Sequence, residues 1–383
     1  MKFLPYGRQH IDSKDIDAVA ATLRSGWITQ GPKIAEFEAS LCSYTGAKYA
    51  AAVANGTAAL HIAALAAGIG KGDEVITSPI TFAASANCIL YAGGRPVFAD
   101  IHADTANIDS AQIEKKITRR TKAVIPVHFS GHPCEMDKIS TIAGKHKLIV
   151  IEDAAHALGS EYKGGKVGNC RYCDMATLSF HPVKHITTGE GGAVLTNNRE
   201  LYEKLLMLRT HGITKDAAGF TNAGPYDGAW YHEMQALGFN YRITDFQCAL
   251  GLSQLKKLAG FVAARRRLVK LYGKHLSGTP GLTLPVEKPY GKSAWHIYCV
   301  RVKNAKTRKF VFDRLRENGI VAQVHYLPVY LHPYYRKLGY KKGSCPNAEA
   351  FYGGEITLPL FPDMTPADVV FTAKKLKAIL ERV

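Results

Sequence analysis

No uninterrupted apolar run in this chain reaches the length that a membrane span needs, about 20 residues. The first fifteen residues carry charged and polar side chains in place of the apolar centre of a secretory signal. We therefore expect a cytoplasmic protein without a membrane partner. The chain also lacks G-x-x-x-x-G-K-[ST], and it lacks G-x-G-x-x-G in a strand-to-helix turn. These absences argue against a nucleotide-hydrolysing or dinucleotide-binding domain.

A disulfide framework is not expected, because the cysteines are scattered through a long chain of intracellular character, where thiols stay reduced. Cys170 and Cys173 form one C-x-x-C, and His181 and His185 follow at helical spacing. The gap from Cys173 to His181 is shorter than in a zinc finger, so we predict ordinary thiols and no metal site. The eight cysteines are Cys42, Cys88, Cys134, Cys170, Cys173, Cys248, Cys299 and Cys345.

Acidic residues are scarce relative to basic ones, with 32 Asp and Glu against 49 Lys and Arg and a formal net charge of +17. An excess of this sign favours anionic partners. The basic clusters at 115–116, 119–120, 265–267 and 341–342 lie far apart and carry no interleaved aromatic residues. We therefore expect no nucleic-acid partner, and an anionic small substrate stays open. A polyanion-binding protein is the alternative from another functional class.

Hydrophobic residues make up 46% of the 383 positions, as in a globular protein of two domains or of one domain with an appended lobe. Apolar strands alternate with helical segments through the first half of the chain. This rhythm predicts an α/β fold with a mostly parallel sheet covered by helices. The expected strands are residues 49–53, 74–77, 96–99, 123–127, 148–151 and 176–180.

The C-terminal part changes to a mixture of helices and strands that predicts a smaller α+β lobe. Expected strands at 294–302 and 321–326 flank a helix at 306–318, and a last helix follows Pro366. We expect a large domain over residues 1–250 and a small domain over 251–383. The polar, glycine-rich stretch 211–233 predicts an active-site or interface loop.

Lys184 lies on a bend between an expected strand and a turn with glycines at 189, 191 and 192. Lysine acts as a nucleophile when its surroundings lower its pKa, and carbonyl compounds and pyridoxal phosphate are its usual partners. A surface lysine is the alternative. Asp153 follows a strand, where side chains face the ligand crevice of an α/β sheet, or it caps a helix. Gly56 and Thr57 begin a helix that suits a phosphate, or they form an ordinary helix start.

Taken together, several motifs resemble those of the DegT-type sugar aminotransferases, which are fold-type I enzymes that use pyridoxal phosphate. The motifs come in the family's order and span nearly the whole chain. They are N-G-T at 55–57, T-F at 81–82, E-D-A-A-H at 152–156, S-F-H-P-V-K at 179–184, T-G-E-G-G at 188–192, G-F-N-Y-R at 238–242 and Q-V-H-Y at 323–326.

The resemblance implies a role for each matching residue. Lys184 would bind pyridoxal phosphate covalently and shuttle a proton, and Asp153 would pair with the pyridine nitrogen. Phe82 would stack on the ring and His156 would lie near its oxygen substituent. Gly56, Thr57 and Ser179 would hold the phosphate, which Asn240 of a second subunit would also reach. The resemblance therefore implies a homodimer with shared active sites.

The lysine at position 184 also separates two branches of the resembled family, because a dehydratase branch carries histidine there. Transamination is therefore implied, with glutamate as amino donor and a nucleotide-linked keto-sugar as acceptor. The segments 29–31, 78–82, 156–162 and 323–326 look like those of the pseudaminic acid branch, which aminates C4 of a UDP-linked 4-keto-6-deoxy-N-acetylhexosamine. Another nucleotide-linked 3- or 4-keto sugar is the rival. The implied substrate-binding residues are Tyr6, Gly26, Trp27, Ile28, Thr29, Gln323, Val324, His325 and Tyr326.

Overall fold

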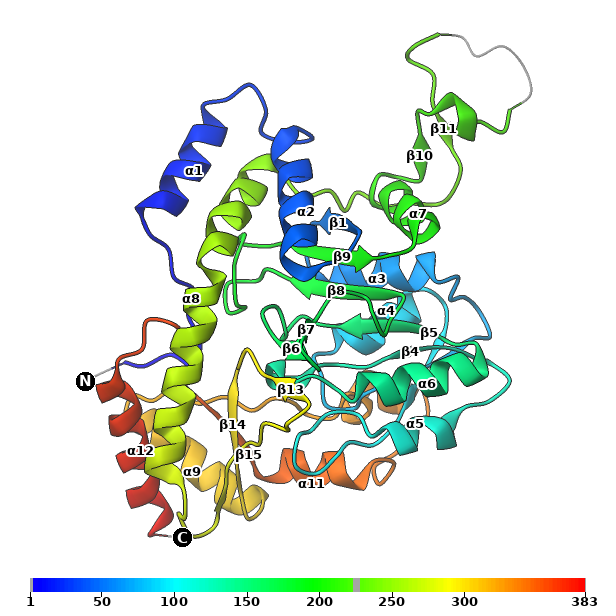
Figure 1. The fold of residues 1–383 in the computed structure, drawn as a ribbon. Helices are drawn as coiled ribbons and strands as arrows, with labels where there is room; N and C mark the ends of the chain where they lie inside the picture. Colours follow the sequence, from blue (N-terminus) through cyan, green and yellow to red (C-terminus); the bar gives the residue numbers. More distant parts are fainter. Residues whose placement is uncertain (1–2, 223–227, 383) are drawn as a thin grey trace.

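The structure is a computed structural model that describes residues 3–222 and 228–382. A seven-stranded sheet in the order β1-β9-β8-β5-β4-β2-β3 forms the centre of the larger part (Figure 1). Neighbours from β3 to β8 pair in parallel, whereas β9 is antiparallel to both β8 and β1. The sheet strands are β1 Tyr49–Val53, β2 Glu74–Thr77, β3 Arg95–Phe98, β4 Thr121–Ile125, β5 Ile149–Asp153, β8 Met175–Ser179 and β9 Gly192–Thr196.

Helices cover both faces of this sheet, which confirms the predicted α/β class. The strands are short apolar runs buried on both sides, as parallel strands in a helix-covered sheet are. On one face α3 packs on β8 and β9, and on the other α6 packs on β5. The helices of this part are α1 Ser13–Leu23, α2 Pro32–Thr45, α3 Gly56–Ala66, α4 Ala84–Tyr91, α5 Ser110–Lys116, α6 Met136–His146 and α7 Arg199–Arg209.

The bend that carries Lys184 connects the antiparallel strands β8 and β9. The amide of Lys184 donates to the carbonyl of His181 at 2.8 Å, and the amide of Phe180 donates to Gly191 O at 2.8 Å. Glycine is required at 191, because a Cβ there would lie 2.1 Å from the Thr188 hydroxyl oxygen. The bend is therefore a fixed structure on the sheet and not a loose surface loop.

The C-terminal part packs around a second apolar core formed by a three-stranded sheet in the order β12-β14-β15 and three helices. Leu4 from the N-terminal segment joins this core. Of the 49 Lys and Arg, 24 lie in residues 251–383, against 8 of the 32 Asp and Glu, so this part holds most of the net charge. Its elements are β12 Leu282–Thr283, β14 Tyr298–Val302, β15 Glu355–Leu358, α9 Ala305–Glu317, α10 Pro333–Lys337, α11 Pro346–Gly354 and α12 Pro366–Leu380.

The long helix α8, Asp245–Leu276, runs through both parts (Figure 1). Its first half gives Cys248 and Leu258 to the core of the large part. Its second half gives Leu268, Tyr272 and Leu276 to the core of the small part. The proposed domain boundary at residue 250 thus falls within a continuous helix, which fixes the orientation of one part relative to the other.

Two segments of the sequence differ from what their patterns predict. Residues 321–326 form no strand: Gln323 alone makes a bridge, with Thr357, and the amide of His325 donates to the Glu355 carboxylate at 2.7 Å instead of to a neighbouring strand. The prediction of a strand there was wrong. The stretch 211–233 contains strand β10, Ile213–Thr214, which pairs with β11, Glu233–Met234; residues 223–227 of it lie outside the described residues.

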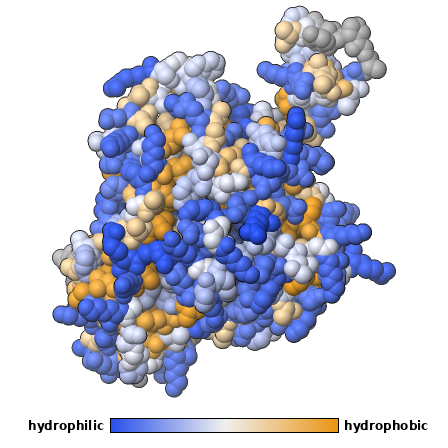
Figure 2. All heavy atoms as spheres, viewed as in Figure 1, coloured by the Kyte–Doolittle hydropathy of each residue, from blue (hydrophilic) through white to orange (hydrophobic). Residues whose placement is uncertain are grey.

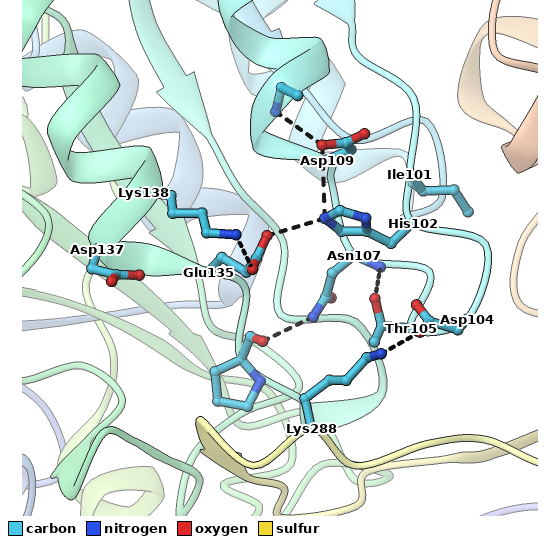
Figure 3. Close-up of polar contacts among 12 residues, drawn as sticks. Ile101, His102, Asp104, Thr105, Asn107, Asp109, Glu135, Asp137, Lys138 and Lys288 are labelled. Carbon is cyan, nitrogen blue, oxygen red and sulfur yellow. Dashed lines mark hydrogen bonds and ion pairs between the residues drawn. The ribbon is translucent and has the colours of Figure 1, made fainter.

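A polar network ties the loop after β3 to the segment between β12 and β14 of the small sheet (Figure 3). Lys288 forms an ion pair with Asp104 at 2.5 Å. The Asn107 side chain donates to the carbonyl of Pro133 at 3.0 Å and accepts from the amide of Phe129 at 2.9 Å. Because the Phe129 ring contacts the Tyr326 ring edge to face, the network helps to position Tyr326, which lines the cavity described below.

Polar side chains cover most of the face in Figure 2, with apolar patches between them. Trp27 and Ile28 are two large apolar side chains that remain 59% and 51% exposed. Within the described part of the chain, no helix combines the length and the apolar character that crossing a bilayer requires.

Candidate active site

A cavity of about 760 Å³ lies at the carboxyl edge of the central sheet. The strands β1, β2, β5 and β8 end at this edge, where ligands bind in open α/β sheets. The loops after β1 and β2 add the starts of α3 and α4, and the small part adds one short segment. Ten of the residues named from the sequence line the cavity: Tyr6, Gly56, Thr57, Phe82, Asp153, His156, Ser179, Lys184, His325 and Tyr326.

One end of the cavity presents backbone amides at the start of α3. The Asn55 side chain caps this helix by accepting a hydrogen bond from the amide of Ala58 at 2.8 Å. The cap does not use the amides of Gly56 and Thr57, which come earlier in the helix. A Cβ at Gly56 would lie 2.8 Å from the Ser179 Cβ, so only glycine lets the helix start approach β8 this closely. Amides at a helix start, together with the Thr57 and Ser179 hydroxyls, could hold a phosphate group.

Asp153 lies buried at the end of β5 with its carboxylate held by two donors. The Ser85 hydroxyl donates to Oδ2 at 2.6 Å and the amide of Ala155 donates to Oδ1 at 3.1 Å. Thr81 supports Ser85, since the two hydroxyl oxygens are 2.6 Å apart. The sequence left two roles open for Asp153, a helix cap and a ligand-facing carboxylate. The bond from the Ala155 amide is a capping contact, and the side chain also lines the cavity. Ser85 was not predicted to lie at the site, and Thr81 was named only as part of the T-F motif at 81–82, without a role.

Lys184 faces the same cavity from the bend between β8 and β9. Burial lowers the pKa of its amine to about 8, and the negative charge of Asp153 opposes this effect. A lysine with this pKa carries a substantial fraction of neutral amine near neutral pH, whereas an exposed lysine carries almost none. The amine can therefore attack a carbonyl carbon or accept a proton.

Three buried histidines, His156, His185 and His296, lie close enough to Lys184 for its charge to affect their pKa values. Burial, with the nearby charge of Lys184, lowers the pKa of His156 well below its usual value, so its ring is neutral. Its Nε2 lies 3.3 Å from the Tyr326 hydroxyl, while its Nδ1 has no hydrogen-bond partner among the described residues. The rings of His296 and His185 continue the cluster, with the His156 and His296 centroids 4.2 Å apart. Neither His185 nor His296 was predicted to lie at this site.

Seven residues named from the sequence lie outside this cavity: Gly26, Trp27, Ile28, Thr29, Asn240, Gln323 and Val324. The 26–29 loop lies beside the start of α8, where the amide of Asp245 donates to Ile28 O at 3.0 Å. Asn240 is exposed and pairs with Thr210. Asn55, Tyr241 and Glu190 line the cavity although the sequence analysis assigned them no role there.

The arrangement fits pyridoxal phosphate. The glycine at 56, where any Cβ would clash, leaves room for a phosphate against the amides. Phe82 is 62% exposed and lines the cavity, so its ring is available for stacking. The unpaired Nδ1 of His156 and the buried carboxylate of Asp153 are polar groups that a ring oxygen and a protonated ring nitrogen would satisfy. Among the described residues no group of three His, Cys, Asp or Glu is placed to hold a metal ion.

Comparison with known proteins relates most of the chain to one family. Residues 9–377 match the DegT/DnrJ/EryC1/StrS aminotransferase family. The chain is 43% identical over 372 residues to the spore coat polysaccharide biosynthesis protein SpsC of Bacillus subtilis, covering 96% of this chain and 94% of that protein. It is 40% identical over 385 residues to the UDP-4-amino-4,6-dideoxy-N-acetyl-β-L-altrosamine transaminase of Campylobacter jejuni, covering 99% and 98%.

Among solved structures, the chain resembles Helicobacter pylori PseC, an aminotransferase involved in the biosynthesis of pseudoaminic acid. The TM-score is 0.92 at 35% sequence identity, and the match covers 100% of both chains. This likeness extends over the large part, α8 and the small part together.

Proposed function

The chain belongs to the DegT/DnrJ/EryC1/StrS aminotransferase family and is a sugar aminotransferase, and we propose that it moves an amino group from glutamate to C4 of a UDP-linked 4-keto-6-deoxy-N-acetylhexosamine. Aminotransferases of this family depend on pyridoxal phosphate. The observation that carries the proposal is the placement of Lys184 and Asp153 in one cavity beside a phosphate-suited helix start.

Pyridoxal phosphate, when bound, would supply the electron-withdrawing ring that takes up and returns the amino group. The amides of Gly56 and Thr57 and the Ser179 hydroxyl would hold its phosphate. The carboxylate of Asp153, oriented by hydrogen bonds from the Ser85 hydroxyl and the Ala155 amide, would pair with the protonated ring nitrogen.

Lys184 would perform the proton transfer. With its pKa lowered to about 8, its neutral Nζ would take a proton from the cofactor carbon that carries the amino group and deliver it to C4 of the sugar. The rings of Phe82 and Tyr326, whose centroids are 6.3 Å apart, line the same cavity as that amine and would border the space that the reacting group occupies. The neutral ring of His156 adds no positive charge that would keep the lysine from accepting the proton.

The sugar is proposed from the likeness to the Campylobacter jejuni transaminase and to Helicobacter pylori PseC. The second candidate is another nucleotide-linked 3- or 4-keto sugar. The chain is also 43% identical to the spore coat protein SpsC, whose name refers to polysaccharide biosynthesis and not to the altrosamine sugar. The test supplies glutamate with a panel of UDP- and dTDP-linked keto-sugars and identifies the aminated product. Amination of a dTDP-sugar alone would replace the first candidate by the second.

The role of Lys184 is tested with Lys184→Ala, which should leave the fold intact and abolish turnover. Turnover at the wild-type rate would refute the assignment. Failure of the wild-type protein to change its absorbance with pyridoxal phosphate, and then with glutamate, would refute the proposed reaction itself.

We also propose a homodimer in which each subunit completes the other's site. Asn240 and the 26–29 loop lie outside the cavity of their own chain, and Trp27 and Ile28 of that loop remain exposed. A second copy would cover this surface and bring Asn240 to the phosphate.

A mixture of subunits tests this arrangement. If Asn240 serves the partner's site, refolding Lys184→Ala with Asn240→Ala subunits together yields mixed dimers with one intact site, so activity returns. If Asn240 serves its own subunit, every site in the mixed dimer is defective, and the mixture stays as inactive as its components.

A further inference from the structure

His325 lies in the cavity with a chain of hydrogen-bonding groups behind it. Its ring packs 5.5 Å from that of Tyr6, and both residues line the cavity. On the side away from the cavity, Nδ1 lies 2.8 Å from the Thr357 hydroxyl oxygen. That hydroxyl is 2.6 Å from Oε1 of Glu355, whose Oε2 accepts from the backbone amide of His325 at 2.7 Å. The groups form a closed path from a buried carboxyl to a cavity-lining ring.

The path has two self-consistent proton arrangements. With Glu355 ionised, the Thr357 hydroxyl donates to Oε1 and accepts from Nδ1–H of His325, which leaves Nε2 as a hydrogen-bond acceptor. With Glu355 protonated, its O–H donates to Thr357, and Thr357 donates to Nδ1. The ring proton then lies on Nε2, which becomes a donor. In both arrangements the amide of His325 keeps its bond to Oε2.

We propose that Glu355 and Thr357 are positioning residues that set which ring nitrogen of His325 carries the proton, and thereby whether its Nε2 donates or accepts toward the keto-sugar. Nδ1 is engaged by Thr357, so Nε2 is the ring nitrogen left for a ligand. The inference rests on the proposed function for the identity of that ligand, although the proton arrangement itself does not depend on it.

The surroundings of Glu355 place the change between the two arrangements within a measurable pH range. Burial raises the pKa of the Glu355 carboxyl to about 8. The hydrogen bonds from Thr357 and from the His325 amide lower this pKa, but burial has the larger effect. The groups that face it are Cys299 on β14, Arg308 on α9 and His325 and Tyr326 on the segment before η3, a short helical turn at Val329–Leu331. The contact with Cys299 and the charge of Arg308 both favour the ionised carboxyl, but burial outweighs them.

The ring of His325 itself stays neutral over the same range, because burial, with the charge of Lys184, lowers its pKa to about 4. A change in Glu355 therefore alters the position of the ring proton and not the charge of the ring. Below pH 8 Nε2 donates, which suits a carbonyl, ether or phosphate oxygen of the substrate. Above pH 8 Nε2 is an acceptor, so its lone pair faces the lone pairs of the same substrate oxygen and the hydrogen bond is lost.

The consequence is a pH dependence in binding of the sugar rather than in the chemical step. Loss of one substrate hydrogen bond weakens binding by about tenfold. We expect KM for the keto-sugar to rise about tenfold between pH 7 and pH 9.5, with a midpoint near 8. The titration of Lys184 acts on kcat, so the two effects separate in steady-state kinetics.

Substitutions along the path give distinct profiles. In Glu355→Gln the amide oxygen accepts from the His325 amide and the amide N–H donates to Thr357, which holds Nε2 as a donor at every pH. Its KM should stay low up to pH 9.5. Thr357→Val breaks the path and should remove the KM step, whereas Thr357→Ser restores the hydroxyl and should restore the step.

A second measurement follows the proton directly in the wild-type holoenzyme. Side-chain ¹⁵N spectra of protein labelled at histidine distinguish the two neutral tautomers, and the His325 signals are assigned by their loss in His325→Gln. We expect the proton on Nε2 at pH 6.5 and on Nδ1 at pH 9.5. The same tautomer at both pH values, or a KM step that persists in Glu355→Gln, would overturn the proposal. If no keto-sugar is aminated, the proposed function fails, and the tautomer measurement still tests the path.

Discussion

Replacing Lys184 with methionine should make the cofactor-free protein more stable at neutral pH, although it removes the residue on which the proposed chemistry depends. Burial lowers the pKa of the Lys184 amine from 10.5 to about 8. The folded state therefore disfavours the ammonium form, which the unfolded chain carries freely in water. Methionine has a similar length and no charge to desolvate.

The size and sign of the effect follow from these two pKa values. At about 1.4 kcal/mol per pKa unit, the separation between 8 and 10.5 costs the folded protein about 3 kcal/mol at pH 7. The cost is full below pH 8. It falls as the pH rises toward 10.5, because the unfolded chain then also loses the proton, and about 2 kcal/mol remains at pH 9.

Urea denaturation of the cofactor-free proteins at pH 7, 8, 9 and 10 measures this difference in the free energy of unfolding. The control is Lys374→Met, at an exposed lysine on α12, which should change stability little and equally at each pH. A Lys184→Met protein that is no more stable than wild type at pH 7, or whose advantage is as large at pH 10, would refute the reasoning.

Three further substitutions test the contacts around the cavity and between the two parts. Gly56→Ala should weaken binding of pyridoxal phosphate at least tenfold, because its Cβ would lie 2.8 Å from the Ser179 Cβ; titration of the bound chromophore measures this, and an unchanged Kd would contradict it. Ser85→Ala removes the 2.6 Å donor to Asp153 and, at about 1.5–3 kcal/mol, should slow transamination about tenfold to a hundredfold while leaving cofactor affinity nearly unchanged. Arg265→Met should lower the free energy of unfolding, since the buried guanidinium donates to the carbonyls of His296 and Leu360 at 2.9 Å and methionine leaves both without a donor; release from the burial that lowers the pKa of Arg265 to about 10 offsets part of this loss. A urea midpoint equal to that of wild type would show that these carbonyls find other partners.

Local patterns in the sequence predicted the fold class, because whether a segment forms a strand, a helix or a turn depends largely on residues close together in the chain. Short apolar runs separated by helical segments required a helix-covered parallel sheet, and the glycines around 189–192 required a tight bend after β8. Asp153 was placed at the sheet edge for the same reason, since a strand ends there. The pattern at 321–326 was misleading, because an apolar run favours a strand only where a partner strand is available, and here the Glu355 side chain takes the His325 amide.

The family resemblance added the roles of residues that no local pattern assigns, such as Phe82 and Asn240. It did not place them. In the structure Phe82 lines the cavity of its own chain, whereas Asn240 lies outside it. A resemblance transfers residue identities position by position, but whether two such positions share a cavity depends on how distant segments pack.

By itself, the sequence determined the kind of chemistry this protein can carry out: a lysine on a rigid bend, a carboxylate at a strand end and a glycine at a helix start are each set by a few neighbouring residues. The tertiary structure alone decided what surrounds them. Ser85 reaches Asp153 across 68 positions, and Thr357 reaches His325 across 32. Such contacts depend on the packing of whole elements against one another, which short-range periodicity does not encode, so the proton path behind His325 becomes apparent only in the folded chain.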